Sequence, residues 1–131
     1  MASELRVNTL KDASGNNSVA TSVVFGGTAK FWIKPAADLA SISDSYNVSS
    51  LDDDGTGDGG VHISNDMSSA NYVILGLTQD QNTTTFTRQC DITDATQAAG
   101  TFDFEVYAVS SSANRTNSDT QAYLAGLGDL A

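Results

Sequence analysis

The residues that could perform chemistry in this chain are few, and the densest group is the acidic, glycine-rich run DDDGTGDGG at positions 52–60. Hard cations such as Ca²⁺ bind several carboxylate and carbonyl oxygens, and glycine permits the tight loop that this requires. Asp52, Asp54 and Thr56 match positions one, three and five of a helix-loop-helix calcium loop, but position twelve is Ile63 instead of a bidentate Glu. We therefore interpret the run as a hairpin connection with solvated acidic side chains and expect no metal cofactor, with a weak cation site as the alternative.

Nucleophilic or acid–base catalysis would have to use a small set of side chains. Cys90 is the single cysteine and His62 the single histidine, and they are far apart in the sequence. Asp103 and Glu105 form the nearest approach to a carboxylate pair, but on alternate positions of one strand they are expected to be solvated charges. Because no nucleophile, base and orienting group occur in a recognisable order, we expect no catalytic site and no enzyme.

The elements that must position these residues are strands. Apolar and polar residues alternate with period two along most of the chain, and the segment 101–110 is the clearest half-buried strand. The run Tyr72–Leu75 is apolar at every position, which predicts a central strand with both faces covered. Roughly eight or nine short strands at turn spacings predict an all-β fold, an antiparallel β-sandwich with jelly-roll or Greek-key connections. The tail from Asp119 to Ala131 is expected to supply an edge strand at Thr120–Leu124 or to be a loose apolar C-terminus that is ordered only against a neighbour.

The N-terminal region is predicted to be an extended strand arm. A turn at Asp12–Asn17 separates a first strand from a second at Val19–Phe25, and Gly26-Gly27 reverses the chain into a third at Thr28–Lys34. Because proline ends a strand ladder, we place the boundary before Pro35, with residues 1–34 as an arm for attachment or oligomer contact and 35–131 as the sandwich body.

Charge divides the chain at the same place. Residues 1–34 carry four basic and two acidic side chains, a formal charge of +2, whereas residues 35–131 carry two basic and fourteen acidic ones, a charge of −12. A basic arm is suited to an acidic neighbour, and an exposed strand edge can be completed by another subunit. The predicted interface combines the apolar and basic residues of this region. They are Leu5, Val7, Leu10, Lys30, Trp32 and Lys34.

Composition excludes several partner classes. A net charge of −10 argues against a nucleic-acid partner, because phosphate contacts need clustered Lys and Arg. We find neither a signal peptide nor an apolar run long enough for membrane insertion, and one cysteine agrees with a reducing compartment. Synthesis and assembly in a cytoplasm are therefore expected.

Three segments together carry a resemblance to a known class of proteins. They are SELRVNTLKDASGNNSVATSVVFGGTAKFWIK at 3–34, NVSSLDDDGTGDGGVHIS at 47–64 and DMSSANYVIL at 66–75. In wording and order they resemble short virion proteins of tailed bacteriophages, marine phages in particular, that are described as tail-fibre-like. The resemblance covers about the first 75 residues and includes no catalytic signature.

The resemblance implies a virion structural protein that assembles as a homotrimer with other virion proteins and takes part in host attachment. Within that class, a tail-fibre module competes with a capsid decoration or head-fibre protein. A second class is a carbohydrate-binding β-sandwich whose ligand is a host surface glycan or receptor, because an aromatic face with a polar rim suits sugar recognition. The candidate stacking residues are Trp32, Tyr46, Tyr72 and Tyr107.

Overall fold

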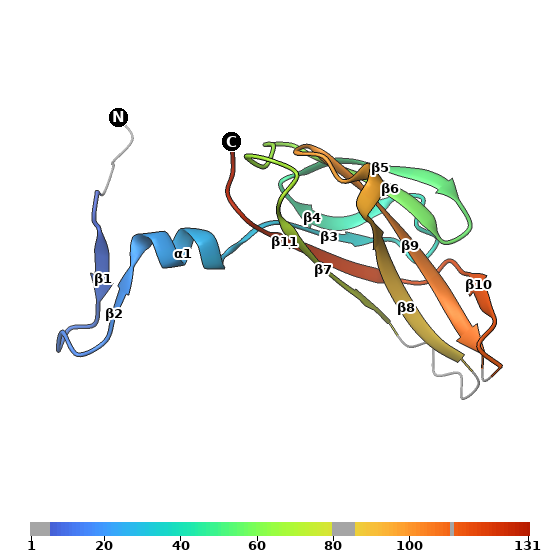
Figure 1. Ribbon diagram of the computed structural model, residues 1–131, viewed down its shortest axis with the longest axis horizontal. Coiled ribbons are helices and arrows are strands. Elements are labelled where there is room, and N and C mark those ends of the chain that lie inside the picture. Colours follow the sequence, from blue (N-terminus) through green and yellow to red (C-terminus); the bar gives the residue numbers. More distant parts are fainter. Residues whose placement is uncertain (1–5, 80–85, 111) are drawn as a thin grey trace.

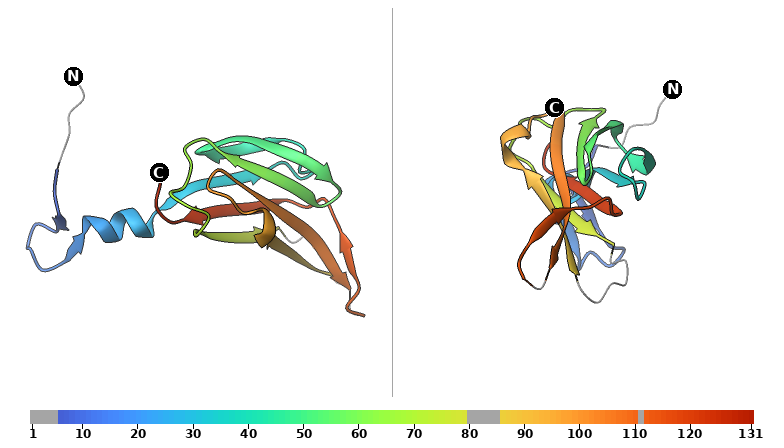
Figure 2. Two further views of the ribbon diagram at one scale, coloured as in Figure 1. Left: turned by 45° about the horizontal axis from the view of Figure 1, so that its top comes forward. Right: turned by 90° about the vertical axis from the view of Figure 1, so that its right-hand side faces the viewer.

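The computed structural model describes residues 6–79, 86–110 and 112–131. Its strands form two sheets that pack face to face, and a hairpin followed by a short helix projects from one end of the sandwich (Figures 1 and 2). The predicted all-β antiparallel sandwich is thus confirmed.

One sheet has the strand order β4-β3-β11-β7, and we call it the β3 sheet. Its strands are β3 (Ala29–Pro35), β4 (Ile42–Tyr46), β7 (Val73–Thr78) and β11 (Ala122–Leu127). All neighbouring pairs in it are antiparallel. Strands from both ends of the chain therefore meet in this sheet, because β11 lies between β3 and β7.

The second sheet is built around β9, and we call it the β9 sheet. Its strands are β5 (Val48–Gly55), β6 (Asp58–Ile63), β8 (Phe86–Thr93), β9 (Thr101–Ser110) and β10 (Arg115–Asn117). On one side β9 pairs with β8, and on the other it pairs with β6 and then with β10. A 3₁₀ turn, η1 (Asp94–Thr96), connects β8 to β9.

The core lies between the two sheets. The largest fully buried side chains come from facing strands, with Phe31 and Ile33 on β3 opposite Phe102 and Phe104 on β9. The Phe31 and Phe102 rings lie 5.4 Å apart between centroids. The inward alternation predicted for 101–110 is confirmed, because Phe102, Phe104 and Val106 are buried.

The projecting arm consists of β1 (Thr9–Lys11), β2 (Ser18–Ala20) and α1 (Thr21–Gly27). The predicted turn at Asp12–Asn17 is present, with Gly15 at a φ of 74°. The prediction that Val19–Phe25 is a strand is wrong, because most of it lies in α1. A strand at this place would need a second partner, whereas a helix forms its hydrogen bonds locally, as Thr28 N–H does to the Val24 carbonyl.

The structure places the junction between arm and sandwich earlier in the sequence than the expected boundary before Pro35. Strand β3 begins at Ala29, pairs with β4 and β11, and carries core residues, so residues 29–34 belong to the sandwich. The first 28 residues hold two basic and two acidic side chains, a charge of 0, and residues 29–131 hold four and fourteen, a charge of −10. The projecting part of the arm is therefore uncharged overall, and the expected +2 depended on Lys30 and Lys34 of β3.

Two predictions about the β3 sheet are wrong. The run Tyr72–Leu75 does not form a central strand, because β7 lies at the end of the strand order and exposes alternate side chains. The segment after Thr120 is neither an edge strand nor loose, because β11 lies between two partners. Gly126 makes this central position possible, since a Cβ there would overlap the ring of Phe31.

The stretch 41–51 is divided between the two sheets. Asn47 has a φ of 55° and separates β4 in the β3 sheet from β5 in the β9 sheet. Its amide donates to the Lys30 carbonyl at 3.0 Å and accepts from the Asn65 backbone at 2.9 Å. The expected hairpin around the acidic run is present, and β5 and β6 continue through most of that run to a turn at Thr56-Gly57.

Candidate interaction surfaces

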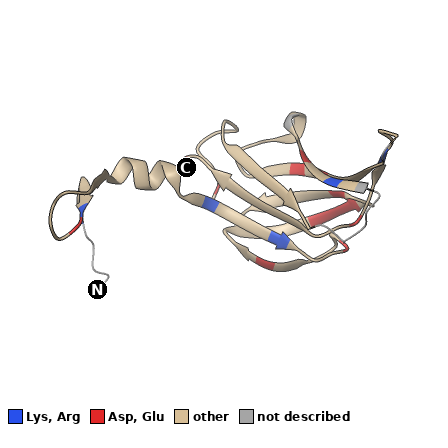
Figure 3. Cartoon of the chain, turned by 90° about the horizontal axis from the view of Figure 1, so that it is seen from below, with Lys and Arg blue, Asp and Glu red and all other residues tan. Residues whose placement is uncertain are grey.

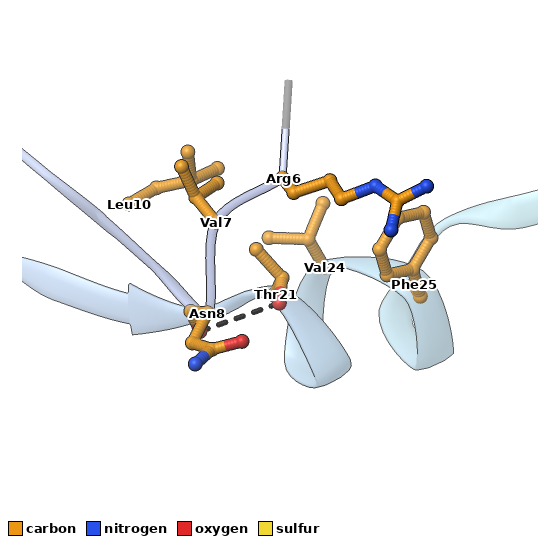
Figure 4. A pocket seen from close by; sticks show the side chains of 7 residues that line it. All are labelled: Arg6, Val7, Asn8, Leu10, Thr21, Val24 and Phe25. Atoms are coloured by element: carbon orange, nitrogen blue, oxygen red, sulfur yellow. Dashed lines mark hydrogen bonds between the residues drawn. The ribbon is translucent and has the colours of Figure 1, made fainter. Parts of the chain in front are cut away.

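The arm has an apolar groove between β1 and α1. Figure 4 shows Val7 and Leu10 on one wall, and Val24 and Phe25 of α1 on the other. The groove has a volume of about 510 Å³ and is completed by Arg6, Asn8 and Thr21. Thr21, Val24 and Phe25 follow the i, i+3, i+4 spacing of one helix face, which is why they line it together. We call these seven residues the arm groove.

The arm has no buried core among its described residues, and local hydrogen bonds hold its structure instead. The Asp12 carboxylate accepts hydrogen bonds from the Asn17 side chain at 2.7 Å and from the Asn16 backbone at 3.1 Å. The hydrogen bond from Asn17 holds the pKa of Asp12 below its usual value. The Thr21 backbone donates to the Asn8 carbonyl at 3.0 Å and joins the helix to the hairpin. No α1 residue is buried, so the arm depends on polar contacts at its surface.

Lys30 connects the arm to the sandwich. Its ammonium donates to the carbonyls of Phe25 and Thr28 and to the Thr28 hydroxyl, and only 8 % of the residue is exposed. A cation at the end of a helix satisfies carbonyls that have no partner within the helix and complements the helix dipole. The side chain thus caps α1 from the first strand of the sandwich.

The outer face of the β3 sheet is apolar. Tyr46 on β4 is in register with Trp32 on β3, Trp32 with Ala125 on β11, and Ala125 with Leu75 on β7. These four side chains form one row across all four strands. We use the name outer face for this row and its outward-pointing neighbours, which are Lys34, Val73, Leu77 and Tyr123.

Large apolar groups on this face are open to solvent. Leu77 is 71 % exposed, Val73 58 % and Trp32 38 %. A shallow hollow of about 430 Å³ lies between Trp32, Leu75, Leu77 and Tyr123. The Lys34 ammonium lies 5.9 Å from the centroid of the Tyr123 ring, at the limit of a cation–π contact.

The predicted interface residues separate into two groups. Val7 and Leu10 are exposed in the arm groove, whereas Trp32 and Lys34 lie on the outer face. Lys30 is buried as the helix cap and is not available as a surface contact. Leu5 lies outside the described residues.

The outward face of the β9 sheet is acidic. A hollow of about 360 Å³ is lined by Asp54, Asp58, Asp103 and Glu105, together with Gly59, Thr93 and Phe104. Partial burial, and then the nearby Glu105, raise the pKa of Asp58. Glu105 also forms an ion pair with Arg115. Among the described residues, no group of three His, Cys, Asp or Glu side chains has a geometry that could hold a metal ion.

Other residues considered for chemistry have structural contacts. Burial, followed by the nearby Asp91, raises the pKa of the Cys90 thiol to about 12, so it is protonated at neutral pH. His62 Nε2 lies 2.8 Å from the Asp52 carboxylate, across the β5–β6 pair.

Two of the four aromatic residues considered as sugar platforms are not exposed. Tyr72 is buried and donates to the Ala98 carbonyl at 3.0 Å, and burial raises its pKa to about 12. Tyr107 donates to Asp91 at 2.5 Å and is covered by the Arg115 guanidinium, 3.9 Å from its ring centroid. Only Trp32 and Tyr46 remain as surface aromatics from that set, and Tyr123 joins them on the outer face.

Sequence reasoning missed Leu75, Leu77 and Tyr123 on the outer face and Phe25 in the arm. The signal for the first two was present, because the run from Tyr72 to Leu77 is apolar apart from Gly76, and alternate residues of a strand point to opposite faces. Phe25 was missed because its segment was predicted to be a strand.

Within the part of the chain that the structure describes, no helix has the length and apolarity to cross a membrane. Comparisons with protein-family models, with curated proteins and with solved structures gave no match. Similarity therefore assigns neither the arm groove nor the outer face to a known interface.

Proposed function

We propose that this chain is a non-enzymatic structural protein of a tailed-bacteriophage virion, a tail-fibre-like module that assembles with copies of itself through its N-terminal arm. The observation that carries the proposal is the arm itself. A hairpin and a helix stand away from the sandwich with an apolar groove open to solvent (Figures 1 and 4). The virion and the trimeric state come from the sequence resemblance at 3–34, 47–64 and 66–75.

Energetics favour an arm that is ordered against a partner. An isolated two-stranded hairpin is marginally stable in water, and so is a helix shorter than about 12 residues. Here the hairpin strands have three residues each and α1 has seven. The arm groove is the main apolar area of these elements that is still exposed. Burying it against a partner would stabilise both the hairpin and the helix.

Surface area supports the same proposal. A compact monomer of this mass exposes about 6,600 Å², whereas this chain exposes 8006 Å². The excess of about 1,400 Å² is close to the area that one standard protein–protein interface buries. A closed ring of identical subunits has one interface for each chain. A trimer of this kind would therefore bury an area close to the excess on every subunit.

Native mass spectrometry of the full chain tests self-assembly. At micromolar concentration we expect a trimer that dissociates when Val7 and Leu10 are both replaced by Ser, because both line the arm groove. Val23→Ser is the control, since Val23 is also apolar and is more exposed than either residue but lies outside the groove. A wild-type chain that is monomeric throughout would contradict the proposal.

Position on the particle is tested separately. Antibody labelling of purified virions distinguishes a tail-fibre module, which labels the tail, from a capsid decoration or head-fibre protein, which labels the head. Absence of label on intact and on disrupted particles would count against both positions.

A carbohydrate-binding module is the second candidate, and the surface pair Trp32 and Tyr46 favours it. The two rings come from neighbouring strands in register and are exposed on one face. Aromatic faces stack on sugar rings when polar groups at the rim supply hydrogen bonds. A glycan array with the intact oligomer would support this function by a reproducible signal that Trp32→Ala abolishes, whereas uniform silence would argue against it.

A further inference from the structure

We propose that the outer face of the β3 sheet is the receptor for the arm of a second copy of this chain, with Phe25 of one copy seated in the hollow between Trp32, Leu75 and Leu77 of the next. This inference rests on the proposed function, because it names the surface that receives the arm. Four observations support it, and they concern exposure, strand pattern, charge and the shape of the contact.

Exposed large apolar side chains of the described residues gather in two places. One set lies on the arm, with Phe25 at 67 % exposed, and the other lies on the outer face, with Leu77 as its most exposed member. Only Leu130, near the C-terminus, is outside both sets. The arm projects away from the sandwich, so the two sets cannot cover each other within one chain (Figure 2). Contact between chains can cover both.

The pattern of β7 indicates that its outward side is covered in the assembled protein. Strands with apolar residues on both faces are typical of positions buried on both sides. Ile74 packs on the core, whereas Val73, Leu75 and Leu77 point outward and are exposed. The adjacent β11 adds Tyr123 to the same side. An apolar area of this kind marks an interface when it is contiguous.

Electrostatic repulsion between two copies of the chain is weakest at the outer face. The sandwich carries a net charge of −10, and seven of its acidic residues lie on the strands of the β9 sheet. The only charged residues on the strands of the β3 sheet are Lys30, Lys34 and Asp44, and Lys34 is in register with Asp44. Figure 3 shows blue segments on the strand that leads from the arm into the sandwich. An arm of zero net charge meets little repulsion there, whereas the acidic β9 sheets of two copies would repel each other.

The hollow on the outer face is suited to an aromatic side chain of the arm. Phe25 is the largest exposed apolar side chain of the arm, and the hollow of about 430 Å³ on the outer face is lined by apolar side chains apart from Lys34. Buried aromatic anchors of this kind contribute much of the affinity of an interface. The donor and receptor surfaces differ, so the contact is heterologous and can close into a ring.

Complementation between two variants tests the inference on the full chain. The arm variant carries Val24→Gln and Phe25→Gln, which keep helix propensity and remove the anchor. The face variant carries Leu75→Thr and Leu77→Thr, which keep strand propensity and remove the hollow. We expect each variant alone to be monomeric and an equal mixture to form a 1:1 complex, because one variant supplies an intact face and the other an intact arm. Each double substitution should raise the dissociation constant of its contact by about 30-fold or more.

The matched control is Leu130→Thr, which removes an exposed leucine outside both surfaces. It should leave the wild-type oligomer unchanged. Circular dichroism and unfolding curves of both double variants verify that the sandwich is folded before the mixture is interpreted.

A cross-linking experiment keeps the inference testable if a variant misfolds. Phe25→Cys in one chain and Leu77→Cys in another should form a disulfide between chains under mild oxidation, identified by peptide mass spectrometry. The same mass spectrometry distinguishes this product from any disulfide at the partly buried native Cys90. Leu130→Cys in place of Leu77→Cys should give no such product.

The outcomes separate this inference from the proposed function. A monomeric wild type contradicts both. An oligomeric wild type that survives the face variant but not the arm variant places the arm on another surface and overturns the inference alone. An oligomer lost in the face variant but kept in the arm variant indicates face-to-face packing of two β3 sheets, or another ligand of the outer face, and also overturns it.

Discussion

The sandwich and the arm obtain their order in different ways. In the sandwich, Phe31, Phe102 and Phe104 interlock between two sheets and are fully buried. In the arm, order comes from backbone pairing, from the Asp12 turn and from the Lys30 cap, and no α1 residue is buried. The comparison indicates that the sandwich has a buried core of its own, whereas the apolar side chains of the arm are exposed to solvent.

The largest expected effect concerns the core. Phe102→Ala removes a fully buried ring that contacts Phe31, and it should lower the free energy of unfolding by about 3–5 kcal/mol. Val23→Ala on the arm should change it by less than about 0.5 kcal/mol, because Val23 is exposed. Urea denaturation of both variants, followed by Trp32 fluorescence, measures the difference. Equal effects would mean that the arm shares the stability of the core.

Two glycine substitutions sharpen the comparison at the level of packing. Gly126→Ala places a methyl group on the ring of Phe31 and should destabilise the sandwich by about 1–3 kcal/mol. Gly26→Ala in α1 meets open space and should stabilise the helix by about 0.5–1 kcal/mol, because alanine loses less backbone entropy in a helix. Thermal unfolding reports the first change, and helical circular dichroism together with amide exchange reports the second. A destabilising Gly26→Ala would contradict the open surroundings of this position.

A third substitution tests the link between the two regions. Lys30→Met removes the ammonium that binds the Phe25 and Thr28 carbonyls, and it should speed amide exchange in residues 21–28 by about tenfold. The sandwich should keep its unfolding midpoint, since the methionine side chain fills similar space. Lys34→Met is the control, because that ammonium lies over Tyr123 and away from the helix. Unchanged exchange in α1 would contradict the assigned role of Lys30.

The sequence predicted the parts of the fold that follow from alternation and turn chemistry. The segment 101–110, the hairpin around 52–60 and the Asp12–Asn17 turn are all present, because each depends on residues close together in the chain.

What sequence could not supply was the order of strands within each sheet. Whether Tyr72–Leu75 is central or at an edge depends on β11 pairing beside it, which is a contact between distant segments. The central place of β11 depends in turn on Gly126 yielding space to Phe31. From the sequence, only Trp32 and Lys34 of the outer face were predicted as interface residues. Leu75 and Leu77 could be assigned to this face only once the register of β7 with β11 was known.

The smallest expected effect is a pH dependence confined to the arm. The hydrogen bond from Asn17 lowers the pKa of Asp12 below its usual 3.8, so the folded turn favours the charged carboxylate. A group whose folded pKa is lowered stabilises the structure above its unfolded pKa, and the stabilisation is lost as pH falls through the folded value. Amide exchange and chemical shifts of Gly15 and Asn16 should therefore report loosening of the turn below about pH 4.

Asp12→Asn is the matched variant for this measurement. It keeps the size of the side chain and removes the titration, so its turn should be weaker at neutral pH and insensitive to acid over the same range. Because the arm has no core, this loosening should leave the amide exchange of β9 unchanged. A transition shared by the turn and β9 at the same pH would contradict the independence of arm and sandwich, and would mean that the two regions unfold together.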